Sequence, residues 1–220
     1  MVSFQPLPDR AADASYPALL AELLDLVGAE HPEPAEDTPR GRRSWQHAAR
    51  RTIGKALAGV TPREEWFAPL ARAAVLEPDP SFNRDLVRPM VELFGRRRVR
   101  EALLDHLGEG SDAERAGAAR AWYWTLIGVR FEPGTRTPTA ASQAELDAYA
   151  DLDRRYGDTA LRVFVATDNI DVRRCILPGL DLRPRGCRPE LRDLVAEATR
   201  IARESADDYL RHRVEIQVAE

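Results

Sequence analysis

The chain has 220 residues, of which 44% are hydrophobic and 31% charged, and its formal net charge is −4. These values are ordinary for a folded soluble protein with a real core, and they argue against a disordered chain. No apolar run approaches the roughly 18–20 residues that a membrane-spanning helix needs. The first residues lack a basic start followed by an apolar stretch, so we expect no signal peptide and, by default, a cytoplasmic protein.

The charge is unevenly distributed along the chain. Residues 1–39 hold eight acidic side chains and one arginine, whereas residues 38–63 hold seven basic side chains and no acidic one. Lys55 is the only lysine, and this preference for arginine, together with abundant alanine, is typical of a GC-rich bacterial genome. We divide the chain into an acidic N-terminal segment (1–39), with one helix and a proline-rich linker, and a helical domain (40–220) that packs with that helix as one unit.

Helix-start signals recur along the chain. Three segments, Thr61–Glu64, Ser111–Glu114 and Ser142–Glu145, place a glutamate three residues after a capping hydroxyl. Two runs with the composition of a strand, 161–168 and 214–219, lack a partner run, so we expect a helix for the first and a frayed tail for the second. The apolar spacing and the Gly and Pro breaks predict helices near 15–28, 44–58, 62–76, 82–94, 97–107, 112–127, 143–155, 158–167, 170–179 and 189–213.

Short helices joined by short loops predict an all-α protein built of stacked antiparallel helical hairpins. Arg84, Arg115 and Arg173 each follow a helix start, at separations of one and about two units of a repeat roughly 30 residues long. Residues 169–173 (NIDVR), and more loosely 111–115, are similar to the start of the second helix in HEAT-like repeats, which residues 61–200 resemble. The resemblance implies a right-handed α-solenoid with a concave binding face; an irregular helical array is the alternative, because residues 128–157 interrupt the period.

Residues 109–124 run from a turn through small side chains to three consecutive aromatic residues. The alanines and glycine of 116–121 allow close approach of neighbouring helices. At about 100° per residue, Trp122, Tyr123 and Trp124 spread over roughly 200° and cannot share one seam. We therefore expect two of them in the core and the third on an exposed or groove-lining surface.

A basic stripe follows one side of the helix expected at 44–58. Arg43, His47, Arg51 and Lys55 recur every four residues, and Arg50 lies beside them. Three interpretations stay open: a solvated helix face, a face covered by the acidic linker 30–39, or a surface for an external anionic partner.

Two further arginine clusters and one long loop are candidates for contacts. Arg96, Arg97, Arg98 and Arg100 stand at a helix start, where the helix dipole disfavours cations, and we favour an exposed turn over a binding site. The other cluster lies in 183–192. The loop 128–142 is long enough to be either functional or disordered.

No constellation for catalysis or metal binding emerges from the residue order. The four histidines are scattered, Cys175 and Cys187 have no CxxC partner and read as ordinary thiols, and no nucleophile-elbow, dinucleotide or phosphate-loop pattern occurs. We expect no metal and no cofactor, and the sequence argues against an enzyme without deciding the matter.

The sequence therefore favours a non-catalytic protein that binds another macromolecule through an arginine-rich surface, with a protein partner, acidic or otherwise, preferred over nucleic acid and with no membrane contact. A HEAT-like DNA-binding protein or DNA glycosylase, with Trp122 or Trp124 beside Asp112 or Asp171, is the alternative, although no motif carries it. A small-molecule sensor is the further alternative. The candidate contact residues are Arg43, His47, Arg50, Arg51, Lys55, Arg96, Arg97, Arg98, Arg100, Trp122, Tyr123 and Trp124.

Overall fold

The computed structural model describes residues 15–33, 37–126, 129–135, 137–183 and 187–219. Throughout these ranges the protein is helical, as predicted, and its one β feature is an isolated bridge between Phe131 and Pro138. The α-helices are α1 (Ser15–Val27), α2 (Pro39–Ala56), α3 (Phe67–Leu76), α4 (Arg84–Phe94), α5 (Arg96–Glu109), α6 (Asp112–Trp124), α7 (Ala140–Asp147), α8 (Ala150–Ala166), α9 (Ile170–Ile176), α10 (Arg192–Glu204) and α11 (Asp208–Val218). Short 3-10 turns, η2 (Glu64–Trp66), η3 (Leu177–Gly179) and η4 (Pro189–Leu191), join some of them.

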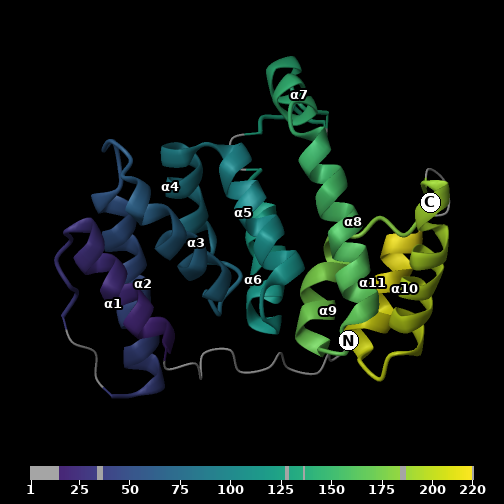
Figure 1. Ribbon diagram of the computed structural model, residues 1–220, viewed down its shortest axis with the longest axis horizontal. Coiled ribbons are helices and arrows are strands. Elements are labelled where there is room, and N and C mark those ends of the chain that lie inside the picture. Colours follow the sequence, from purple (N-terminus) through teal and green to yellow (C-terminus); the bar gives the residue numbers. More distant parts are fainter. Residues whose placement is uncertain (1–14, 34–36, 127–128, 136, 184–186, 220) are drawn as a thin grey trace.

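The helices form pairs that stack in chain order along the long axis of the molecule (Figure 1). The pairs are α1/α2, α3/α4, α5/α6, α8/α9 and α10/α11. The first helices contact one another in sequence and make a first layer, and the second helices, α2, α4, α6, α9 and α11, make a second layer in the same way. Only α7 stands outside this pairing, projecting beyond the rest of the array in Figure 1. Stacked helix pairs are thus observed, while their kinship with HEAT-like repeats stays a prediction.

Helix α6 is the centre of the array because it contacts α3, α4, α5 and α9. Its small residues, from Ala116 to Ala119, and Ala121 are all buried, as the close-approach argument predicts. The tightest point is Gly117, where an added Cβ would lie 1.5 Å from the carbonyl oxygen of Val75. Only glycine fits at this crossing.

Three expected helix starts have different outcomes. The Ser111–Glu114 capping box is present with both of its reciprocal hydrogen bonds. The expected box at Ser142 is wrong, because the hydroxyl of Thr139 caps α7 and Ser142 lies inside that helix. At 61–64 the chain enters a 3-10 turn that has no side-chain cap, and α3 follows it.

Two expected helix boundaries are also wrong. Gly157 does not break the chain, and α8 runs through it where two helices were expected. A glycine inside a helix costs about 1 kcal/mol, less than α8 gains by burying apolar side chains such as Leu152 and Phe164. Conversely, the helix expected over 189–213 is two helices, since the carboxylate of Asp207 accepts a hydrogen bond from the Leu210 amide and starts α11. This helix also takes in most of the expected tail.

Helix α1 contacts α2 and α3 and fully buries Leu20, Leu23 and Leu24 against them. The hydrophobic core is continuous from these residues to Leu210 and Val214 of α11. Residues 34–36 of the proline-rich linker lie outside the described ranges. Among the helices of the described ranges, none is both long enough and apolar enough to cross a membrane.

Candidate binding groove on the second helix layer

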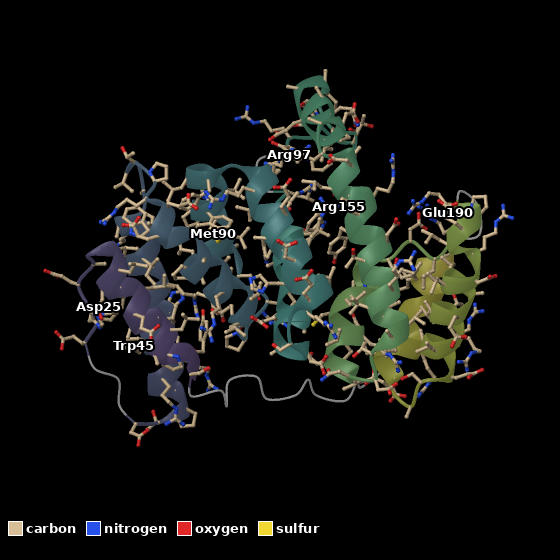
Figure 2. The ribbon with its side chains drawn as sticks, in the orientation of Figure 1. Asp25, Trp45, Met90, Arg97, Arg155 and Glu190 are labelled. Carbon is tan, nitrogen blue, oxygen red and sulfur yellow. The ribbon has the colours of Figure 1, made fainter. Side chains whose placement is uncertain are left out.

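The arginine cluster at the start of α5 is neutralised by acidic side chains from other elements. The contacts include Arg96 Nη1 to Glu145 Oε1 at 3.0 Å, Arg97 Nη1 to Asp151 Oδ2 at 2.9 Å, Arg98 Nη1 to Glu64 Oε2 at 2.7 Å and Arg100 Nη1 to Asp153 Oδ1 at 3.1 Å. Figure 2 shows Arg97 at the end of α5 that faces α7. These carboxylates offset the unfavourable helix dipole, and the cluster attaches α7 and α8 to α5.

The interpretation of this cluster as an exposed turn is wrong for Arg96 and Arg100, which are 7% and 0% exposed. Arg100 Nε donates a hydrogen bond to Thr125 Oγ1 at 3.0 Å, and its guanidinium lies 4.8 Å from the centre of the Trp122 ring. Burial lowers the pKa of Arg100, and the charge of Asp153 opposes that effect. The Trp122 ring also stacks on the ring of Tyr156, with ring centres 4.2 Å apart. Arg100 and Trp122 are therefore parts of the core.

Arg50 is likewise a core residue and does not belong to the exposed stripe of α2. It is 2% exposed, and its Nη1 donates a hydrogen bond to Glu77 Oε2 at 2.7 Å. The Tyr16 hydroxyl donates to the same oxygen at 2.5 Å. Burial raises the pKa of Glu77, while Arg50 and Tyr16 oppose that rise. The ring of Phe82 lies under Arg50 and beside the half-buried His47, so this polar cluster stabilises the segment between α3 and α4.

The remaining stripe residues, Arg43, Arg51 and Lys55, are exposed on α2. Within the described part of the chain, no carboxylate lies at ion-pair distance from any of the three. Asp37, at the end of the acidic linker, pairs with Arg42 at 2.6 Å. In the part of the linker 30–39 that the structure describes, 30–33 and 37–39, no carboxylate pairs with the three stripe residues, and 34–36 lie outside the described ranges.

A basic hollow of about 580 Å³ opens between α2 and α4. Arg51 lines it from α2, and Arg84 and Arg88 line it from α4. Its acidic groups come from α4 itself: Asp85 Oδ1 lies 3.6 Å from Arg84 Nε, and Glu92 Oε1 accepts a hydrogen bond from Arg88 Nε at 2.8 Å. Exposed pairs of this kind contribute only about 0–1 kcal/mol.

An aromatic hollow of about 690 Å³ adjoins the basic one, between α6, α8, α9 and the segment that precedes α4. Tyr123 is 67% exposed, whereas Trp122 is 7% exposed and Trp124 is half-buried, with its indole Nε1 donating to the Pro80 carbonyl at 3.0 Å. This division matches the expectation that one of the three consecutive aromatic residues faces outward. The other apolar lining residues include Leu126, Tyr156 and Pro178.

The basic and aromatic hollows follow one another along the second layer, and a third hollow lies beyond them, between α8 and α10 of the first layer. Trp124 lines both the basic and the aromatic hollow. Asp153 and Asp181 line the aromatic hollow and also the third hollow, of about 220 Å³, which includes Cys187. We call the basic and aromatic hollows together the second-layer groove. Its lining changes along its length, from the arginines of α2 and α4 to aromatic walls with Asp153 and Asp181, which pair with Arg100 and Arg183.

Arg120 and Cys175 belong to the aromatic hollow. Arg120 Nη2 donates to the Glu77 carbonyl at 2.9 Å, and its Nη1 lies 3.4 Å from the sulfur of Cys175. Both cysteines are free thiols. The guanidinium of Arg120 is thus already used within the protein.

The groups expected for catalysis are not gathered in the groove. Neither Asp112 nor Asp171, the acidic candidates of the glycosylase alternative, lines the aromatic hollow, and Asp112 accepts a hydrogen bond from Asn169. In the described ranges, His, Cys, Asp and Glu side chains form no group of three that could hold a metal ion.

Comparisons with known proteins add no relative to this picture, since no family model, no curated protein and no solved structure matches the chain.

Proposed function

We propose that the protein binds an extended segment of a partner protein in the second-layer groove, without catalysing a reaction. The observation that carries this proposal is the outward-facing Tyr123, which borders an aromatic hollow directly beside Arg51, Arg84 and Arg88. Within the described ranges, no carboxylate of another element pairs with any of these three arginines. Protein interfaces are enriched in tyrosine, tryptophan and arginine, and their strongest contacts are aromatic side chains in pockets. In HEAT-like repeats, which the sequence resembles, the concave face would serve this purpose.

The carboxylates of the groove favour a polypeptide over a nucleic acid. Asp153 and Asp181 line the aromatic hollow, and the one cation that the described residues place there, Arg120, is already engaged within the protein. A nucleic acid presents a negative phosphate at every nucleotide, so a strand that followed the groove would meet these carboxylates at close range. A polypeptide can vary its charge from residue to residue. The net charge of −4 also opposes nucleic-acid binding.

A small-molecule receptor is the second candidate. The volume of the aromatic hollow lies within the roughly 300–1,000 Å³ of typical ligand sites, and its lining combines aromatic walls with a few polar groups. A thermal-shift screen of small molecules tests it. A ligand that stabilises the wild type but not Tyr123→Ala, with no dependence on Arg51 or Arg88, would favour this alternative.

The main proposal is tested by selecting peptides that bind the protein from a displayed random 12-residue library. Individual selected peptides are then titrated by fluorescence anisotropy against Tyr123→Ala and against Phe131→Ala. Phe131 is 54% exposed and lines none of the three hollows, which makes it a matched control. We expect Tyr123→Ala to weaken binding at least tenfold and Phe131→Ala to change it less than twofold. Equal affinities for both variants would contradict the groove as the binding site.

A further inference from the structure

The donors of the basic hollow are open to an incoming anion. Arg88 uses its Nε for Glu92, and Arg84 is 3.6 Å from Asp85, too far for a hydrogen bond. Among the described residues, nothing accepts a hydrogen bond from the terminal nitrogens of Arg51, Arg84 or Arg88. A guanidinium carries five N–H donors in a planar fork that matches a carboxylate. Three such forks from two facing helices therefore border one hollow with most of their donors unused.

The groove has no open cation on the other side of Trp124. The aromatic hollow holds Asp153 and Asp181, which pair with Arg100 and Arg183. Among its described lining residues the one cation is Arg120, which already donates to the Glu77 carbonyl and lies against Cys175. An acidic ligand side chain would therefore find no open partner at this end. An uncharged aromatic or long apolar side chain matches the walls formed by Tyr123, Leu126 and Pro178.

We infer that the partner segment carries a run of aspartate or glutamate residues, which lies between α2 and α4, next to an aromatic or long apolar residue, which fills the aromatic hollow. This inference rests on the proposed function and adds the chemistry of the partner to it. The acidic run bonds to the open guanidinium forks, and the apolar anchor displaces water from the aromatic walls. The groove thereby gives the bound segment a fixed direction.

The test uses three fluorescent peptides of equal length. One carries six glutamates, Gly-Ser, and then Trp-Leu; the second replaces the glutamates with lysines; the third has the composition of the first with the charged and apolar residues interspersed. Each is titrated by anisotropy against the wild type, Arg51→Glu/Arg88→Glu, and Arg162→Glu. Arg162 is exposed on α8 and lines none of the hollows, so it is the matched charge reversal.

We expect the first peptide to bind the wild type at least tenfold more tightly than the other two. Arg51→Glu/Arg88→Glu should weaken it at least tenfold and strengthen the lysine peptide, whereas Arg162→Glu should change both less than threefold. Equal binding of the glutamate and lysine peptides, or no effect of the double reversal, would overturn the inference. A single-stranded oligonucleotide of twelve thymidines that binds the wild type more tightly than the glutamate peptide would overturn the inference as well.

Failure of this inference is distinguishable from failure of the proposed function. If selected library peptides depend on Tyr123 but not on Arg51 and Arg88, the groove binds a polypeptide of another chemistry, and only the inference fails. If no selected peptide depends on Tyr123, the proposed function itself fails. Far-UV circular dichroism and the thermal midpoint establish that each variant is folded; all three substituted arginines are exposed, so the reversals leave the core intact.

Discussion

The arginines of α5 and those of the basic hollow look alike in the sequence but differ in what surrounds them. Arg97 and Arg98 pair with carboxylates that lie 54 and 34 residues away along the chain. Within the described ranges, Arg84 and Arg88 pair only with neighbours on their own helix, one and four residues away. The arginines of α5 therefore hold separate elements together, whereas the arginines of the basic hollow are available to a ligand. The distance in sequence to the acidic partner separates the arginines that hold elements together from those whose donors remain open.

The largest expected effect comes from Arg50→Ala. The substitution leaves the carboxylate of Glu77 buried without its cation, which typically costs about 3–5 kcal/mol of unfolding free energy. Burial already raises the pKa of Glu77, and loss of Arg50 raises it further, so the folded state binds a proton more tightly than the unfolded state. The cost should thus be greatest near neutral pH and shrink as the pH falls toward the ordinary glutamate pKa of about 4.3.

Urea unfolding at several pH values measures this effect, with the adjacent Arg51→Ala as the control. Arg51 is exposed, and its substitution should change the unfolding free energy by no more than about 0.5 kcal/mol at any pH. Equal stabilities of the two variants would show that the contrast between core and groove arginines does not hold on α2.

Arg100→Ala should have the next largest effect, a loss of about 2–4 kcal/mol. The side chain is fully buried against Trp122 and Tyr149, whereas its partner Asp153 is 44% exposed and can regain water. Chemical denaturation gives the free energy, and tryptophan fluorescence reports the altered surroundings of Trp122. Arg98→Ala, on the same helix but partly exposed, is the control, and it should cost no more than about 1 kcal/mol.

Arg97→Ala should act locally. Arg97 bonds both carboxylate oxygens of Asp151 and the carbonyl of Ala148, next to the end of α7. Its removal should lower the global stability by no more than about 1 kcal/mol but raise hydrogen exchange in 141–149. Hydrogen–deuterium exchange with mass spectrometry measures this, with Arg162→Ala as the matched variant. Unchanged exchange in α7 would mean that Arg97 does not hold that helix.

The smallest effect on stability is expected for Arg51→Ala/Arg84→Ala. Both side chains are exposed. Arg84 lies 3.6 Å from Asp85, beyond hydrogen-bond distance, and 5.9 Å from the centre of the Trp124 ring. The unfolding free energy should change by no more than about 0.5 kcal/mol, while the glutamate peptide should bind at least tenfold more weakly. A large loss of stability would show that Arg51 and Arg84 support the fold and are not held open for a ligand.

Local patterns predicted much of the fold. Apolar periodicity identified most helices, and the small residues before Trp122 correctly marked a close helix crossing. The errors fall where tertiary contacts override local signals. Gly157 stays helical because its neighbours on α8 are buried, and Thr139 caps α7 in place of Ser142, whose hydroxyl instead accepts a hydrogen bond from the Arg130 amide.

The site was predicted less completely. Arg51 and Tyr123 were among the candidates, but Arg84 and Arg88, four residues apart on α4, were not recognised as a binding pair. Arg50 could have been separated from the stripe, because it shares a helical face with Ala49 and Ile53, both fully buried. The distant carboxylates that neutralise α5 carry no local signal, since they are brought to it only by the stacking of the pairs.

The crossing at Gly117 has a consequence for how the molecule comes apart. Repeat arrays can melt pair by pair from their ends, because each unit usually touches only its neighbours. Here the backbone of α6 at Gly117 packs directly against the backbone of the last turn of α3, and α6 also contacts α9. Unfolding that begins at either terminus must therefore stop before α6 or disrupt α6 together with the helices that it contacts. We expect the chain to unfold as one cooperative unit.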